Sequence, residues 1–164
     1  MQQRYATNPA QIPGMTTDDL RATYLIPELF VRGEISVTYT HHDRVVLGGA
    51  VPAGNDLVLP GYPEIRSDYF LEHRELGIVN VGGTGTVTAD GEVYTLVKGA
   101  CLYLGRGIRD VVFADAADAD AGAQFYLFSA PAHTAYPAAL VSPGTNNSDT
   151  RNWLRSSSVV MPGI

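Results

Sequence analysis

The chain has 164 residues, of which 45% are hydrophobic and 17% are charged, and this composition predicts one globular domain with a substantial core. Eleven basic and seventeen acidic residues give a net charge of −6. We therefore expect no nucleic-acid partner, because phosphate binding needs a basic surface. A small acidic ligand is compatible with this charge, since a local arginine can bind a carboxylate whatever the sign of the whole chain.

The N-terminus, beginning Met1-Gln2-Gln3, has no apolar signal region, and no run of about 18 apolar residues follows it. These features predict a cytoplasmic protein with no membrane partner. The single cysteine, Cys101, lies in the apolar run 100–104. We expect it to be a buried core thiol, because no activating base is visible near it in the sequence.

Residues 1–15 are predicted to form an arm. A helix should follow, because Thr16 can cap its N-terminus while Asp19 lies three residues later. Asp18 and Asp19 also suit the positive end of the helix dipole. The helix should end by about Ile26, since Pro27 disfavours helical geometry in the residue before it.

The remainder of the chain is predicted to be built from short strands separated by Gly-rich and Pro-rich turns, a pattern typical of an all-β sandwich or barrel. The candidate strands are 35–40, 45–47, 69–71, 77–81, 86–88, 92–94, 102–104, 111–113 and 124–128. Asp90-Gly91 predicts a type I′ hairpin turn. We expect one β-domain over 16–141. Residues 142–164 should be a linker followed by a closing strand or by the start of a second barrel that the chain lacks.

The stretch from Tyr69 to Gly107 has the glycine spacing of a metal-binding cupin barrel. In the general cupin pattern, two histidines lie six and four residues before a glutamate, and a glycine lies seven residues after it. Glu75 and Gly82 have this spacing. The expected histidine positions, however, hold Tyr69, Leu71 and, in the second half of the pattern, Asp110. Tyr69 and Leu71 cannot replace imidazoles at a typical zinc or iron site, and three of the four expected ligands are absent, so we expect no metal here.

Two other groups could be considered as metal ligands. His41 and His42 would point to opposite faces of a strand, which excludes joint binding of one ion. We expect His42 instead to form a hydrogen bond in the adjoining turn. The stretch 115–122 alternates Ala and Asp and is predicted to be a solvated loop. Metal binding by its aspartates, Asp115, Asp118 and Asp120, is the less favoured alternative, because no calcium-loop pattern accompanies them.

Several separate strings, in one order, resemble the 5-keto-4-deoxyuronate isomerase (4-deoxy-L-threo-5-hexosulose-uronate ketol-isomerase) family. They are HDR at 42–44, VLGG at 46–49, EHRELG at 72–77, NVGG at 80–83, DVVFA at 110–114 and APAHTAYP at 130–137. The resemblance implies a bicupin fold, hexameric assembly and a role in pectin and uronate breakdown. It implies conversion of 5-keto-4-deoxyuronate to 3-deoxy-D-glycero-2,5-hexodiulosonate. It also implies a zinc ion held by histidines and a glutamate of the second barrel.

On this resemblance the chain is the first, metal-free half of a bicupin. We expect no catalytic residues, no metal ligands and no bound cofactor in it. Its candidate substrate-binding residues are Arg74, Glu75 and His133, and Arg74 has the planar fork that suits a uronate carboxylate. The structural alternatives are an ion-pair ladder that pairs Glu72 with Arg74 and His73 with Glu75, and a turn-shaping hydrogen bond for His133.

Two further interpretations stay open. The chain could be a metal-free single cupin that binds a sugar acid or serves as an oligomerisation module. It could also be an enzyme that uses a new site in this barrel. Arg106 and Arg109 could face a partner surface or a uronate, although solvated arginines are more common.

Overall fold

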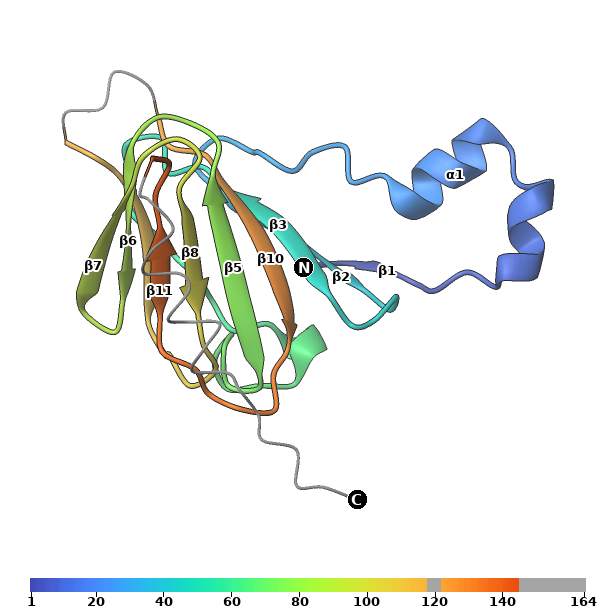
Figure 1. The fold of residues 1–164 in the computed structure, drawn as a ribbon. Helices are drawn as coiled ribbons and strands as arrows, with labels where there is room; N and C mark the ends of the chain where they lie inside the picture. The colour runs from blue at the N-terminus through green and yellow to red at the C-terminus, as the bar shows by residue number, and fades with distance from the viewer. Residues whose placement is uncertain (118–121, 145–164) are drawn as a thin grey trace.

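Short strands of the predicted kind build two β-sheets that face each other across one core (Figure 1). The structure is a computed structural model that describes residues 1–117 and 122–144. The larger sheet contains seven strands and the smaller sheet four, with β-ladders within each sheet. The expectation of an all-β fold with a short N-terminal helix is confirmed. The described ladders remain two sheets and do not close into one continuous barrel.

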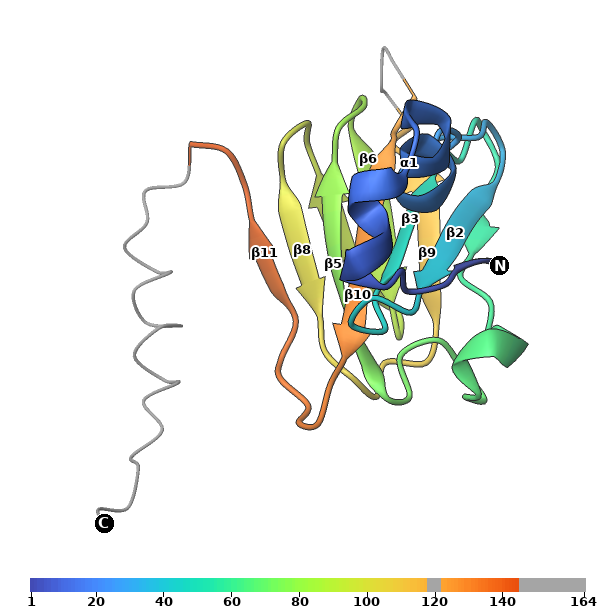
Figure 2. The same ribbon diagram turned by 90° about the vertical axis from the view of Figure 1, so that its right-hand side faces the viewer.

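The seven-stranded sheet has the order β1-β2-β3-β10-β5-β8-β11. Its strands are, in that order, Gln2–Arg4, Ile35–Thr40, Val46–Ala50, Phe125–Pro131, Arg74–Asn80, Cys101–Leu104 and Ala139–Val141. All its neighbouring pairs are antiparallel except β1 and β2, which run parallel. Figure 2 shows this sheet with the helical segment in front of it.

The four-stranded sheet has the order β4-β9-β6-β7, and all its pairs are antiparallel. Its strands are Leu57–Val58, Val111–Asp115, Gly85–Ala89 and Glu92–Leu96. The turn between β6 and β7 contains Asp90 and Gly91 with φ of 47° and 87°. Positive φ at both central residues is what a type I′ turn requires, so the predicted hairpin is confirmed.

The core forms because alternate residues of the strands point inward. In β5, for example, Leu76 and Ile78 are fully buried while their neighbours are only half-buried. Phe113 of the smaller sheet meets Phe125 of the larger sheet, with ring centroids 5.4 Å apart. Full burial of one such side chain contributes about 1.5–3 kcal/mol, so this contact is a main link between the sheets.

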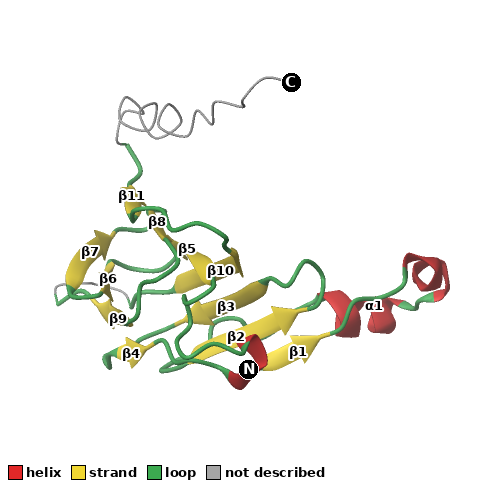
Figure 3. Ribbon diagram, turned by 90° about the horizontal axis from the view of Figure 1, so that it is seen from below, coloured by secondary structure: helices red, strands yellow, loops and turns green. Residues whose placement is uncertain are grey.

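The helix α1 (Thr17–Tyr24) begins where predicted. The Thr16 hydroxyl accepts from the Asp19 amide (3.2 Å), and an Asp19 carboxylate oxygen accepts from the Thr16 amide (3.0 Å). Together with the short 3₁₀ helix η1 (Pro9–Gly14), α1 extends away from the sheets (Figures 1 and 3). Neither helix contains a buried residue. Among the described residues, no helix has the length and apolar character needed to cross a bilayer.

The predicted strand at 69–71 is wrong. These residues form a bend before β5, where Phe70 and Leu71 are buried and anchor the connection to the core. Three short strands were missed, because β1, β4 and β11 have only two or three residues each and show no alternation in sequence. The strand β1 lies within the predicted arm.

The prediction of a buried Cys101 is also wrong, since the thiol is exposed. The strand β8 alternates, with Leu102 and Leu104 facing the core and Cys101 and Tyr103 facing outward. Residues of the apolar run 100–104 are therefore not all buried in the core, because strand alternation turns some of them outward.

Candidate functional site

A cavity of about 780 Å³ lies where β5 begins and β10 ends, and part of its wall comes from the loop that holds η2 (Pro63–Ile65). Basic side chains outnumber acidic ones in its lining, which includes three arginines, two histidines and one glutamate. The basic residues are Arg44, Arg66, Arg74, His41 and His73. Such a concentration of donors around a concave surface favours an anionic ligand.

Arg74 is the best-fixed of these residues. It is only 5% exposed because it is the first inward-pointing position of β5. Its Nε donates to Ser129 Oγ (3.0 Å), and its Nη2 donates to the carbonyls of Ser129 and Arg44 (both 2.8 Å). The guanidinium carbon lies 5.9 Å from the centre of the Tyr39 ring. Burial lowers the pKa of Arg74, although an arginine stays protonated at neutral pH.

Glu64 supplies a carboxylate to the same cavity. Its Oε1 lies 3.8 Å from the amino group of Met1. Its Oε2 is buried and has no hydrogen-bond partner among the described residues. Glu64 therefore brings one negative charge to a lining that otherwise carries positive charges.

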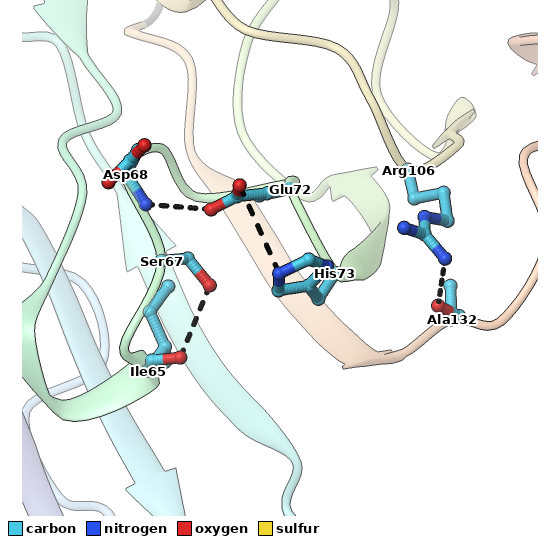
Figure 4. Close-up of polar contacts among 7 residues, drawn as sticks. All are labelled: Ile65, Ser67, Asp68, Glu72, His73, Arg106 and Ala132. Carbon is cyan, nitrogen blue, oxygen red and sulfur yellow. Dashed lines mark hydrogen bonds and ion pairs between the residues drawn. The ribbon is translucent and has the colours of Figure 1, made fainter.

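The neighbouring turn, shown in Figure 4, is held by short-range contacts. Glu72 Oε2 accepts from the Asp68 amide (2.8 Å), and Glu72 Oε1 lies 3.9 Å from the exposed His73 ring. The predicted ion-pair ladder is therefore wrong for Arg74, which is buried and has no carboxylate partner among residues 1–117 and 122–144. The reason is that β5 begins at Arg74, so strand alternation does not extend back to Glu72.

Glu75 points to the opposite side of the sheet from Arg74. It accepts a hydrogen bond from the Tyr103 hydroxyl (2.9 Å). Burial, followed by the hydrogen bond and charge of Glu75, raises the pKa of Tyr103 well above its ordinary value. Glu75 thus takes part in an outer-face contact and does not line the cavity.

His133 is exposed in the segment after β10. Its backbone carbonyl and that of Ala132 accept from Arg106 Nη1 (3.2 and 3.3 Å), and the Ala132 contact appears in Figure 4. Arg109 lies over the Tyr69 ring at 4.7 Å. Of the three predicted substrate-binding residues, only Arg74 borders the cavity, so the structure does not bring the three together.

The donor set at the cupin ligand positions does not fit a zinc ion. Leu71 is buried and has no donor atom, and Glu75 faces away from the core. In residues 1–117 and 122–144, no group of three or more His, Cys, Asp or Glu side chains could hold an ion. His41 and His42 lie in the turn after β2 and not on a strand. The buried Nε2 of His42 has no hydrogen-bond partner in the described part of the chain, and the ring lies 5.7 Å from that of Tyr24.

Asp115 holds two loops together. Its carboxylate oxygens accept from the amides of Gly54 and Ala123, each at 2.7 Å. Asp118 and Asp120 lie outside the described residues, as does the predicted linker beyond residue 144. Asp115 itself therefore has a structural role at the end of β9.

The sequence model of the KduI/IolB family matches residues 27–155. The chain belongs to the KduI/IolB family. A Kineococcus radiotolerans protein named 4-deoxy-L-threo-5-hexosulose-uronate ketol-isomerase is 60% identical to this family member over 146 residues, which are 88% of this chain and 52% of that protein. A Bacillus pumilus protein of the same name is 51% identical over 137 residues, 84% of this chain and 49% of that protein. The chain thus spans about half the length of these curated relatives.

Solved structures with a likeness to this KduI/IolB chain include the Schizosaccharomyces pombe Cnp3 cupin domain. Its TM-score is 0.46 at 14% identity, with 63% of this chain and 68% of that chain covered. A Pseudomonas syringae protein of unknown function has a TM-score of 0.43 at 15% identity, with 74% and 50% covered.

Sequence reasoning missed most of the cavity. Glu64 and Arg66 come from a turn around η2 that the sequence did not predict, and Arg44 comes from the turn before β3. Arg44 and Arg66 both adopt positive φ, at 56° and 51°. Non-glycine residues seldom take this conformation, and sequence alone gave no sign of it here.

Proposed function

We propose that this chain is the metal-free half of a ketol-isomerase that converts 4-deoxy-L-threo-5-hexosulose uronate to 3-deoxy-D-glycero-2,5-hexodiulosonate. The observation that carries the proposal is the 60% identity to a protein of that name over 88% of this chain. The coverage of 52% of that relative supports the view that a second half completes the enzyme. This activity belongs to pectin and uronate breakdown, and we propose a cytoplasmic homo-oligomer.

In this proposal residues 16–141 are the scaffold domain, preceded by an arm at 1–15 and followed by a linker at 142–164. The catalytic site and its zinc ion belong to the other half. When bound there, zinc supplies Lewis-acid stabilisation of the oxyanion that develops as a proton moves between neighbouring carbons. The described residues of this chain contain no donor set for such an ion.

Arg74 is the residue of this chain that we propose to bind substrate. Its guanidinium is fixed by Ser129 and the Arg44 carbonyl, so little side-chain freedom is lost when a carboxylate binds. Glu75 and His133 do not line the cavity. We keep them as positions on the outer face and adjoining loop that could contact a second half or a second copy.

The test is to measure the intact mass of the polypeptide made from the native gene and to assay it. A mass well above 17.6 kDa, with zinc-dependent consumption of 5-keto-4-deoxyuronate, is the expected result. The 164-residue chain alone should show no robust turnover with added zinc. Robust turnover by this chain alone would overturn the proposal.

The second candidate function is a metal-free single cupin that binds a sugar acid. The buried Arg74, which has no acidic partner among the described residues, favours it. A native mass of 17.6 kDa together with thermal stabilisation by uronates, and no turnover, would support this function in place of the first.

A further inference from the structure

Arg74 is a buried cation without a buried counter-charge. Its hydrogen-bond acceptors are the Ser129 hydroxyl and two backbone carbonyls, all of which are neutral. The ion pairs among residues 1–117 and 122–144 join Met1 to Glu64 and Glu72 to His73, so neither involves Arg74. A buried charge that lacks a partner is costly, and an anion in the adjoining cavity would remove that cost.

The guanidinium also has donor capacity left. Nε and Nη2 are used, whereas Nη1 donates to no described residue. Arg74 lines the cavity, and so does Glu64. One cavity thus combines an arginine with an unused N–H group and a carboxylate whose printed contact is the Met1 amino group at 3.8 Å.

We infer that this cavity binds a hydroxylated carboxylic acid, with Arg74 donating to the carboxylate and Glu64 accepting from a hydroxyl group. The planar fork of arginine suits a carboxylate. The Glu64 carboxylate would repel the second charge of a phosphate but can accept a proton donor such as a sugar hydroxyl. The volume of about 780 Å³ is within the range of small-molecule sites.

Two other arginines support an anion at this place. Arg44 and Arg66 are exposed and line the same cavity. Their charges raise the local positive potential, although the chain as a whole is acidic, with a net charge of −6. Within the hydroxylated acids, the choice of a uronate rests on the proposed function.

The first experiment is calorimetric titration of the 164-residue chain with D-galacturonate, D-galactose and inorganic phosphate. Galacturonate should bind at least tenfold more tightly than either of the others, because only it offers both a carboxylate and hydroxyls. Equal affinity for galactose would show that the carboxylate is not recognised and would overturn the inference. Equal affinity for phosphate would overturn the role given to Glu64.

Variants of the lining residues then test whether galacturonate binds in this cavity. Arg74→Lys keeps the charge but loses the fork, and it should weaken galacturonate about tenfold. Glu64→Gln should weaken galacturonate and strengthen phosphate, because the repelling charge is gone. The matched control is Arg106→Gln, since Arg106 donates to backbone carbonyls outside this cavity and should leave binding unchanged.

If Arg74→Lys does not fold, Arg66→Asn tests the site instead, because Arg66 is an exposed residue of the cavity lining. Asparagine accepts the positive φ of 51° found at residue 66, so the fold should be kept while galacturonate weakens by severalfold. Unchanged galacturonate affinity in this variant and in Glu64→Gln would overturn the inference. Binding is measured without turnover, so loss of the isomerase proposal would not by itself remove this site.

Discussion

At the residue scale, Tyr103 and Glu75 form a pair on the outer face of the larger sheet. They come from the neighbouring strands β8 and β5, and the Tyr103 hydroxyl donates to the carboxylate at 2.9 Å. Burial is the larger cause of the raised pKa of Tyr103, and Glu75 adds to it because a phenolate beside a carboxylate is unfavourable. The folded protein therefore holds the Tyr103 proton more firmly than the unfolded chain does.

We predict that this proton contributes stability that is complete below the ordinary tyrosine pKa of about 10 and is lost as pH rises through the raised value. The sign follows because the unfolded chain releases the proton first, so alkaline pH favours unfolding. In Glu75→Gln, Tyr103 should ionise at a lower pH. Carbon NMR titration of the Tyr103 ring carbon that bears the hydroxyl measures this, and an unchanged titration curve would contradict it.

Gly105 shows a different residue-scale constraint. A Cβ there would clash with the backbone of Tyr136, which cannot move as a flexible side chain could. At Gly77, in contrast, an added Cβ would meet only the Phe128 carbonyl at 3.7 Å, an ordinary contact. Close backbone approach therefore requires glycine at position 105 but not at position 77.

At the element scale, Asp90 links the β6–β7 hairpin to the segment before β9. Its Oδ1 accepts from the amides of Arg109 and Asp110, at 2.9 and 2.8 Å. Asp90 also adopts the positive φ that the type I′ turn needs. One side chain thus sets both the turn and the approach of the next strand.

Asp90→Ala should lower the free energy of unfolding by about 1–3 kcal/mol, because two amides lose their acceptor. Asp90→Asn is the matched control, since its amide oxygen can still accept and asparagine tolerates positive φ. Urea denaturation of both variants measures the difference. Equal stability of the two variants would show that the acceptor does not matter.

At the scale of the whole molecule, the outer face of the larger sheet leaves apolar side chains in water. Phe128 of β10 and Val141 of β11 are among the exposed large hydrophobic residues, and so is Tyr136 in the segment between these two strands. Phe128 projects from β10 between Leu47 of β3 and Gly77 of β5, near the middle of the sheet. Exposed apolar area of this kind is typical of an association surface.

If the protein is a homo-oligomer, as we propose, Phe128→Glu should lower its mass in solution without changing the secondary structure, because a charge on an interface must be desolvated. Val93→Glu is the matched control, since Val93 is 61% exposed on β7 of the other sheet. Light scattering coupled to size exclusion gives the masses. An unchanged mass for Phe128→Glu would remove this face from the proposed interface.

Local sequence rules predicted structure correctly where the stabilising interactions join residues close together in the chain. The capping pair Thr16 and Asp19 set the start of α1, and Asp90-Gly91 set the hairpin, because each depends on residues within a few positions of one another. The family was equally accessible, since several short strings of residues in one order carry it. Alternation also placed most strands of the larger sheet.

The tertiary structure alone decided the cavity and the orientation of its residues. Arg74 and Glu75 are neighbours in sequence, yet one faces the core and the other faces Tyr103, and the choice depends on where β5 begins. Glu64 comes to the same cavity from a turn without a sequence signal. The sequence by itself determined the all-β class and the local turns, because these follow from short-range chemistry, and it determined the family through matching strings of residues. The site required long-range strand pairing, which sets register and burial only when the whole sheet is assembled.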